Sequence, residues 1–150
     1  MRVLVQRVLQ AQVEVDGVTV GSIGAGLLLL IGLGIGDGSA ELEWMARKVA
    51  GLRIFPDTEG QMNLDLTQVD GAILAVSQFT LYGDCSHGRR PSWMKALEPG
   101  LAEPLFEQFV DLVREQGIPT VETGRFGADM KVHMINDGPV TLWIEREAVS

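Results

Sequence analysis

The sequence predicts one α/β domain over residues 1–150, rich in strands, in which mostly antiparallel, barrel-like sheets carry two main helices. Three observations support this prediction. The chain has 150 residues, of which 46% are hydrophobic and 21% charged, and this length suits one core that buries roughly 70% of the unfolded surface. Several short stretches alternate apolar and polar residues, as half-buried strands do. Two longer stretches repeat their apolar residues with the helical period.

The first third of the chain is predicted to consist of strands. Polar and apolar residues alternate from Met1 to Val8 and again on both sides of the pair Asp16-Gly17. This pair favours a hairpin, because both central residues of a type I′ turn have positive φ. The stretch from Leu27 to Leu33 is apolar almost throughout, which indicates a strand buried on both faces.

A first helix of about 12 residues is predicted to follow Ser39, its N-cap. Ser39 is a favourable N-cap residue, and Glu41 and Glu43 suit the positive end of the helix dipole. The apolar face of this helix comprises Leu42, Met45, Ala46, Val49 and Leu52.

The rest of the chain is predicted to contain short strands and a second helix. The strands are expected at Arg53–Phe55, Gln61–Leu64, Ala72–Phe79, Val121–Thr123, Lys131–Asn136 and Thr141–Glu147. The helix is expected from about Glu103 to Gln116, with Pro104 at its first position and Gly117 ending it.

The acidic composition excludes a protein that coats nucleic acid broadly. Twelve Lys and Arg residues against 20 Asp and Glu give a formal charge of −8, whereas non-specific affinity for phosphates requires many cationic side chains. The longest apolar run, Leu27 to Ile31, is far shorter than the ~20 residues of a membrane helix, and the N-terminus has no signal-peptide pattern. Cys85 is the only cysteine, so we expect a cytoplasmic protein without disulfides or membrane association.

Several common catalytic patterns are missing. The glycine-rich segment from Gly32 to Gly38 lacks the spacing of a phosphate-binding loop, and we interpret it as a turn after a strand. Thiol and imidazole groups come only from Cys85, His87 and His133, none of which has paired metal-ligand spacing. We therefore expect no metal and no cofactor. Cys85 and His87 are a weak candidate nucleophile pair, because no third group orients them.

Two polar clusters remain, each where a predicted strand ends. The first is the segment Ser77–Gly83, which closes the apolar strand from Ala72 with hydroxyl groups and an amide. The second is Asn136–Thr141, which we interpret from the residues alone as a hairpin turn between two strands.

A cationic segment lies between the two clusters. It runs from Cys85 to Lys95 and places Arg89, Arg90, Trp93 and Lys95 within seven positions. Cations that meet phosphates and an aromatic ring that stacks on bases are typical of an RNA-contacting loop. The same composition is equally typical of an ordinary solvated loop.

In the two polar clusters, the cationic segment and several other stretches, the sequence resembles the D-aminoacyl-tRNA deacylases of the bacterial and eukaryotic type. The resemblance runs nearly from end to end. It rests on Met1–Val8, Gly26–Leu28, Ser77–Leu81, Arg90–Ser92, Gly127–Met130 and Asn136–Thr141. The family often has Phe where this chain has Trp93, an exchange of one aromatic residue for another.

The resemblance implies a homodimer that hydrolyses the ester between a D-amino acid and the terminal adenosine of tRNA. Glycyl-tRNA is an implied second substrate. In the implied site, the block Ser77-Gln78-Phe79-Thr80 of one subunit faces Gly138 and Pro139 of the partner subunit, and the peptide bond before Pro139 is cis.

Each block has an implied role. The carbonyl oxygens of the Gly138-Pro139 unit would exclude L side chains by steric clash and accept a hydrogen bond from the α-ammonium group. The main-chain amides around Phe79 and Thr80 would stabilise the oxyanion, while Ser77 and Gln78 shape the pocket around the adenosine and the ester carbonyl. A hydroxyl of the ribose would assist, and no metal would be required.

Three alternatives stay open. In the first, Thr80 acts as a covalent nucleophile and forms an acyl-enzyme. In the second, the protein is a non-catalytic RNA-binding module. In the third, it is a small-ester hydrolase that acts through Cys85 or Thr80 and ignores tRNA.

Overall fold

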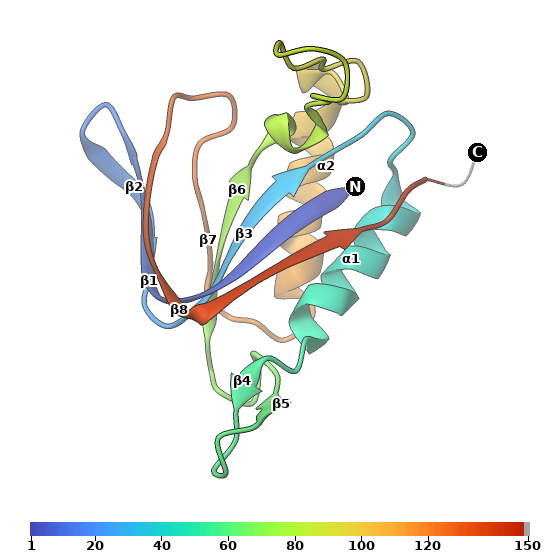
Figure 1. The fold of residues 1–150 in the computed structure, drawn as a ribbon. Helices are drawn as coiled ribbons and strands as arrows, with labels where there is room; N and C mark the ends of the chain where they lie inside the picture. The colour runs from blue at the N-terminus through green and yellow to red at the C-terminus, as the bar shows by residue number, and fades with distance from the viewer. Residues whose placement is uncertain (149–150) are drawn as a thin grey trace.

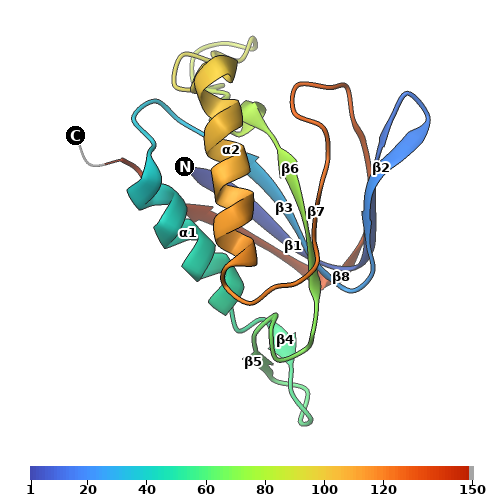
Figure 2. The same ribbon diagram turned by 180° about the vertical axis from the view of Figure 1, so that it is seen from behind.

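The fold is a strongly curled sheet with two helices on one face (Figures 1 and 2). The computed structural model describes residues 1–148. Its elements are β1 (Arg2–Val15), β2 (Val18–Ile23), β3 (Gly26–Gly32), α1 (Ser39–Gly51), β4 (Phe55–Pro56), β5 (Met62–Leu64), β6 (Ala72–Ser77), the 3-10 helix η1 (Phe79–Tyr82), α2 (Pro99–Arg114), β7 (Val121–Thr123) and β8 (Lys131–Glu145). The predicted α/β class with two main helices is confirmed.

Strand β1 pairs with three other strands of the sheet, β2, β3 and β8. One edge pairs antiparallel with β3 and then with β2, and the other edge pairs antiparallel with β8 along almost its full length. The β1–β2 hairpin turns at Asp16 and Gly17 with φ of 50° and 78°, as the Asp-Gly pair predicts. The sheet continues from β3 to β6 and β7 with parallel pairing, because α1 and α2 provide the crossovers that parallel strands need.

The main hydrophobic core lies between the sheet and the two helices. Val3 and Val5 of β1 and Leu27, Leu29 and Ile31 of β3 point into it. The predicted apolar face of α1 supplies Leu42, Met45, Ala46 and Val49, all fully buried, and the centre of α2 supplies Phe109. The double-sided burial predicted for β3 is confirmed, since Leu28 belongs to a second core on the opposite face.

That second core forms because the sheet curls until β2 meets β7. The approach is so close that a Cβ atom at Gly21 would lie 2.1 Å from the Thr123 carbonyl oxygen. Val13 of β1, Leu28 of β3 and Leu74 of β6 fill the space inside the curl. The predicted barrel-like shape is therefore present.

Both helices start earlier than predicted. Gly38, not Ser39, is the N-cap of α1, and its amide donates to the Glu41 carboxylate at 2.9 Å. Helix α2 starts at Pro99, which takes the favourable first position and leaves Pro104 inside the helix. The earlier start of α2 was not predicted because only one residue before Pro104, Ala102, is buried in the core. One apolar position is too few to reveal a helical repeat. Gly117 follows the helix with φ of 88°, in line with its predicted role.

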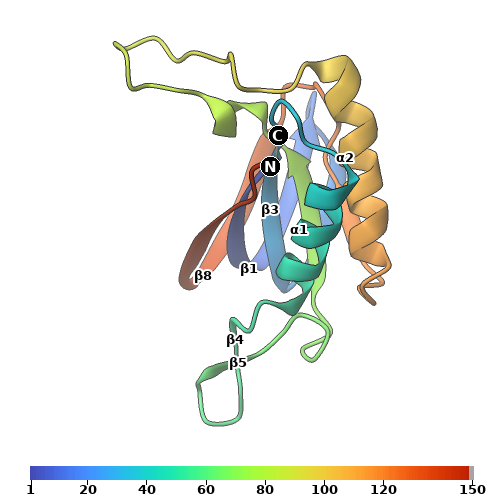
Figure 3. The ribbon, with the colours of Figure 1, turned by 90° about the vertical axis from the view of Figure 1, so that its right-hand side faces the viewer.

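The connection between η1 and α2 leaves the body of the molecule. It extends beyond the sheet on the side away from the helices (Figure 3). It contains the cationic segment from Cys85 to Lys95.

Candidate functional site

The block Ser77-Gln78-Phe79-Thr80 lies where β6 ends. The strand was predicted to continue to Phe79, but it stops at Ser77, and Phe79 begins η1. The Gln78 amide still donates to the Ile31 carbonyl of β3 at 2.7 Å. The chain then turns out of the sheet plane, so the polar residues lie at the carboxyl end of a buried parallel strand, where α/β proteins commonly bind ligands.

Helix η1 is fixed by contacts with β1 and with the segment after β3. The Arg2 guanidinium donates to the Leu81 carbonyl at 2.9 Å and lies 4.3 Å from the centre of the Tyr82 ring. The Tyr82 ring packs on Gly34, where a Cβ atom would lie 2.6 Å from ring carbons. Burial, and next the charge of Asp37, raise the pKa of Tyr82 far above its usual value, so its hydroxyl stays protonated.

Two main-chain amides of this block have no acceptor among the described residues. Within residues 1–148, neither the Phe79 nor the Thr80 amide donates to a backbone or side-chain oxygen, whereas the next amide, that of Leu81, donates to the Gln78 carbonyl. The first amides of any helical turn lack intrahelical partners. Phe79 and Thr80 are both exposed, so these donors can reach an external oxygen.

The Thr80 hydroxyl accepts a hydrogen bond from the Gln78 side-chain amide. This is its only hydrogen bond with the described residues, and an amide nitrogen cannot remove a proton from it. A covalent role of Thr80 would need a base, and residues 1–148 place none in hydrogen-bond contact with this hydroxyl.

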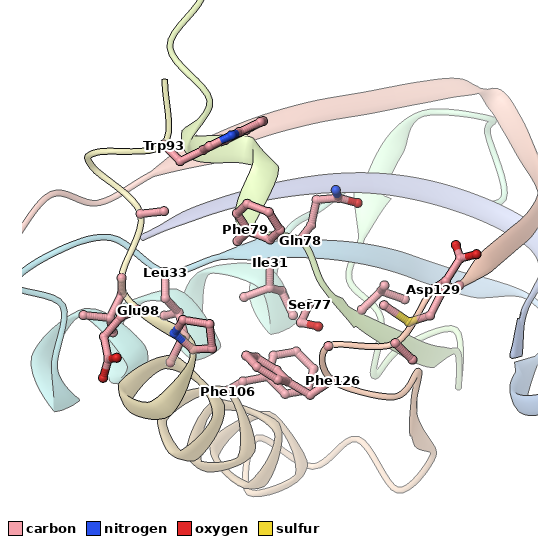
Figure 4. A pocket seen from close by; sticks show the side chains of 18 of the residues that line it. Ile31, Leu33, Ser77, Gln78, Phe79, Trp93, Glu98, Phe106, Phe126 and Asp129 are labelled. Atoms are coloured by element: carbon pink, nitrogen blue, oxygen red, sulfur yellow. The ribbon is translucent and has the colours of Figure 1, made fainter. Parts of the chain in front are cut away.

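A cavity of about 600 Å³ opens beside the block (Figure 4). Ser77, Gln78 and Phe79 line one side, while Thr80 does not line it. The opposite wall comes from α2 and the segment before β8, where the rings of Phe106 and Phe126 lie 6.1 Å apart. At the mouth, Trp93 meets Phe79 edge to face, with ring centres 5.3 Å apart.

The cavity carries little charge. Its only charged lining residues among those described are Glu98 and Asp129, both acidic and both on the rim. Lys131 forms an ion pair with Asp129 at 3.1 Å. An uncharged or cationic group therefore suits this cavity better than a phosphate.

The second polar cluster, Asn136–Thr141, is not a hairpin turn, and that interpretation is wrong. Strand β8 is continuous, and both of its halves pair with β1: Asn136 lies opposite Val8, and Thr141 lies opposite Gln6. The residues between them bulge out of the strand, and the Asn136 side chain accepts from the Val140 amide at 3.1 Å. A hairpin was expected because Gly-Pro is typical of turns; the long partner strand β1 keeps the two halves in line instead.

The bulge has an unusual backbone. The peptide bond between Gly138 and Pro139 is cis, and Gly138 has φ of 127°. A Cβ atom at Gly138 would lie 2.9 Å from Val140 Cγ2 and 3.0 Å from the Val140 nitrogen. Only glycine fits this position without displacing its neighbours.

Sequence reasoning missed Arg7, which holds the bulge. Its Nε donates to the Asp137 carbonyl at 3.2 Å and lies 3.4 Å from the Asp137 carboxylate, and its NH1 donates to the Ile54 carbonyl at 2.6 Å. The side chain is only 11% exposed. A signal was present, because Arg7 follows Val3 and Val5 at the spacing that points toward the core.

The two polar clusters of one chain are far apart. Pairing places Ser77 level with Val3 of β1, whereas the bulge lies beside Arg7, four residues further along and three strands away from β6. Strand geometry converts this offset to about 13 Å along the strands and about 14 Å across them, or about 20 Å in total. One chain therefore does not bring Ser77–Thr80 together with Gly138 and Pro139.

The remaining candidate residues do not form a second site. Cys85 and His87 are both exposed, and no hydrogen bond joins them. His133 is exposed on β8, 3.3 Å from the Glu14 carboxylate. Within residues 1–148, no three His, Cys, Asp or Glu side chains are grouped so that they could hold a metal ion, and no helix is both long and apolar enough to cross a membrane.

Comparison with known proteins relates nearly the whole chain to one family. Residues 4–145 match the family model described as D-Tyr-tRNA(Tyr) deacylase. A protein of Geobacter sulfurreducens named D-aminoacyl-tRNA deacylase is 55% identical over 150 residues, which cover 100% of this chain and 98% of the relative. A protein of the same name from Desulfitobacterium hafniense is 56% identical over 147 residues, covering 98% of each chain.

Two solved structures are also similar. One, titled c-Myc DNA Unwinding Element Binding Protein, has a TM-score of 0.93 and 37% identity, and the match covers 99% of this chain and 100% of that one. The other, titled as a probable eukaryotic D-amino acid tRNA deacylase, has a TM-score of 0.80 and 20% identity, covering 95% and 97% of the two chains. The second likeness concerns the fold alone.

Proposed function

Because the chain belongs to the D-Tyr-tRNA(Tyr) deacylase family, whose members are hydrolases, we propose that it cleaves the ester between a D-amino acid and tRNA. The observation that carries the proposal is the match over residues 4–145 with relatives of that named activity. The products are free D-amino acid and tRNA, and a tRNA substrate implies action in the cytoplasm.

The active unit in this proposal is a homodimer. The end of β6, which leads into Phe79 and Thr80, and the bulge at Gly138 and Pro139 are about 20 Å apart in one chain by strand geometry. A two-fold dimer would let the bulge of each subunit approach the cavity of the other, because such interfaces are reciprocal.

Selection against L-amino acids is assigned to the partner's Gly138-Pro139 unit. The site must accept many different D side chains, so specific contacts to one side chain cannot provide the selectivity. Steric exclusion of the L form can provide it for all of them. Main-chain carbonyl oxygens pointing at the α-carbon leave room for a hydrogen but not for an L side chain, and they accept a hydrogen bond from the α-ammonium. Glycine has no side chain to exclude, so glycyl-tRNA is a second proposed substrate.

Catalysis is assigned to main-chain groups and to the RNA. The Phe79 and Thr80 amides have no acceptor within residues 1–148 and would donate to the oxyanion that develops on the ester carbonyl. Ser77 and Gln78, which line the cavity, would position the terminal adenosine and the carbonyl. The neighbouring ribose hydroxyl would assist the attack, which suffices for an ester that is already activated. No step requires a metal.

The first test compares D-tyrosyl-tRNA with L-tyrosyl-tRNA, each with and without a chelator. We expect rapid release of D-tyrosine, little release of L-tyrosine and no effect of the chelator. Equal rates on the two enantiomers would contradict exclusion by Gly138 and Pro139, and a loss of rate with chelator would contradict the metal-free mechanism. Binding of tRNA without turnover would support the RNA-binding module instead.

A rapid-quench experiment separates the proposed mechanism from a covalent one. The Thr80 hydroxyl has only the Gln78 amide as a hydrogen-bond partner, so we expect no acyl-enzyme during turnover of labelled D-tyrosyl-tRNA. A labelled ester trapped on Thr80 would establish the alternative. Loss of activity after alkylation of Cys85 would support the small-ester hydrolase.

Subunit mixing tests whether the partner completes the site. Gly138→Ala and Gln78→Ala each damage a different half, so each homodimer should be inactive. After unfolding and refolding of a 1:1 mixture, half of the dimers should be mixed, and each should contain one intact site, which restores about a quarter of the wild-type activity. No recovery despite formation of mixed dimers would show that both halves act from the same chain.

A further inference from the structure

Most cations of this acidic protein are already engaged. Among residues 1–148, ion pairs with carboxylates involve Arg2, Arg7, Arg114 and Lys131. Arg53 donates to Asn63, and Lys48 and Arg146 both lie about 5 Å from the centre of the Trp44 ring. Each of these seven side chains therefore already has a partner within the chain.

The other cations are concentrated in one place. Of the five that make no such contact, Arg89, Arg90 and Lys95 lie on the segment from Asp84 to Lys95, which we call the cationic loop, and all three are exposed. The remaining two cations lie elsewhere: Arg47 is on α1, and Arg125 directly precedes Phe126. The only carboxylate of the cationic loop belongs to Asp84, which accepts from the amide and the hydroxyl of Ser86 at 2.9 and 2.6 Å. The loop therefore carries a local excess of positive charge in a chain of net charge −8.

The cationic loop has a defined backbone. Two hydrogen bonds of 2.8 and 2.9 Å between Asp84 and Ser92 close its base. Its end is fixed where the Ile35 amide donates to the Lys95 carbonyl at 3.1 Å. Trp93, between these points, packs on Gly83 and on Phe79 at the cavity mouth. The loop that carries the three cations thus begins and ends beside the cavity, and it extends on the side of the molecule opposite the helices (Figure 3).

The cavity and the cationic loop have complementary electrostatics. The cavity has two acidic residues on its rim and no cation among its described lining residues, so it offers nothing to neutralise a phosphate. An RNA whose terminal nucleoside enters the cavity carries its next phosphates outside it. Cations at the rim are the groups that neutralise such phosphates.

We propose that the cationic loop binds phosphates in the acceptor end of the tRNA whose aminoacyl ester occupies the adjacent cavity. This inference rests on the proposed deacylase function. The tip of the loop, residues 85–91, can reach about 13 Å beyond its base. That reach corresponds to about four stacked nucleotides. Contacts of this kind position the RNA without reading its sequence.

The test measures the salt dependence of kcat/KM for D-tyrosyl-tRNA in the variant Arg89→Gln/Arg90→Gln/Lys95→Gln. Three phosphate contacts to a single strand contribute a slope of about −2 to a plot of log affinity against log salt. Between 50 and 200 mM salt, the wild type should therefore lose about 20-fold more kcat/KM than the triple variant. The matched control Arg47→Gln removes an exposed cation from α1, and its salt dependence should equal that of the wild type.

D-tyrosyl-adenosine, which has the ester but no phosphates, completes the test. The triple variant and the wild type should cleave it at the same rate. Equal losses of the triple variant on both substrates would overturn the inference, because the loop would then act on the cavity. An unchanged salt slope on tRNA would overturn it as well and leave the deacylase function intact. Failure of the wild type on both substrates would instead overturn the proposed function.

Discussion

The two segments of the proposed site, Ser77–Tyr82 and Asn136–Thr141, are held in different ways. The first follows a central parallel strand, and Arg2 and the packing of Tyr82 on Gly34 fix it. The second is a bulge in β8, an edge strand of the sheet, and it depends on Arg7 and on a hydrogen bond to Asn136. The part assigned to catalysis thus sits on a rigid support, whereas the part assigned to selection projects from an edge, where a second subunit can receive it.

Gly138→Ala should have the largest effect on this arrangement. The new Cβ would meet Val140 atoms at 2.9 and 3.0 Å, and φ of 127° is strained for alanine. We expect kcat/KM for D-tyrosyl-tRNA to fall at least ~100-fold, which corresponds to the ~3 kcal/mol of one strained position. Gly60→Ala is the matched control, since Gly60 has φ of 80° in open space. Full activity of Gly138→Ala would mean that the bulge takes no part in the site.

Arg7→Gln should weaken the hold on the bulge without altering the Ser77–Tyr82 segment. It removes the donors to the Asp137 and Ile54 carbonyls, and charge-assisted hydrogen bonds contribute about 1.5–3 kcal/mol each. We expect a 10- to 100-fold lower kcat/KM on D-tyrosyl-tRNA, and a lower ratio of D to L cleavage.

Two comparisons define the role of Arg7. Arg7→Lys keeps the charge but lacks the forked donors, so it should recover only part of the activity. Arg53→Gln removes an exposed arginine that contacts Asn63 and should change neither quantity. An unchanged D to L ratio in Arg7→Gln would assign Arg7 a role in stability alone.

Gly34→Ala should disturb the other segment. A Cβ there would lie 2.6 Å from the buried Tyr82 ring, so the ring and η1 have to move. Overpacking of this kind costs about 1–3 kcal/mol of unfolding free energy, which denaturant unfolding can measure. Gly24→Ala is the control, because nothing lies within 4 Å of its added Cβ. If Gly34→Ala unfolds like the wild type, the contact with Tyr82 does not fix η1.

The pair formed by Arg2 and Glu145 should give the smallest effect. Hydrogen bonding to Arg2, 2.8 Å away, lowers the pKa of Glu145 from its ordinary value of 4.5. A lowered folded-state pKa stabilises the protein above pH 4.5, and this stabilisation disappears as the pH falls through the folded-state value. Glu145→Gln should therefore be less stable than the wild type at pH 7 by no more than about 1 kcal/mol. The difference should shrink in unfolding curves measured below pH 4.5; a constant difference would exclude the ion pair as its cause.

Periodicity and turn residues predicted most of the fold. The alternation around Asp16 and Gly17 and the continuous apolar run after Gly26 each identify a strand correctly, because local burial dictates those patterns. The errors concern long-range pairing. No local signal reveals that β1 is long enough to hold Lys131–Glu145 as one continuous strand with a bulge, and the Gly-Pro pair therefore suggests a turn.

The candidate site was predictable only in part. The hydroxyl and amide groups of Ser77 and Gln78 signalled a polar strand end, and both residues line the cavity. No sequence signal distinguishes Phe106 and Phe126, because an apolar cavity wall has the same composition as a core. Arg7 was overlooked, although a cation in a core-facing position of a strand is rare without a partner.

Strand β1 fixes the separation between Arg2 and Arg7. Arg2 and Arg7 are separated by five residues, and the register with β3 is unbroken between them. An odd separation places the two side chains on opposite faces of the strand, one toward Tyr82 and the other toward the main-chain carbonyls of Ile54 and Asp137. Insertion or deletion of a single residue between them would make the separation even and turn one arginine away from its target. The number of residues between Arg2 and Arg7 is therefore constrained more tightly than the identity of those residues.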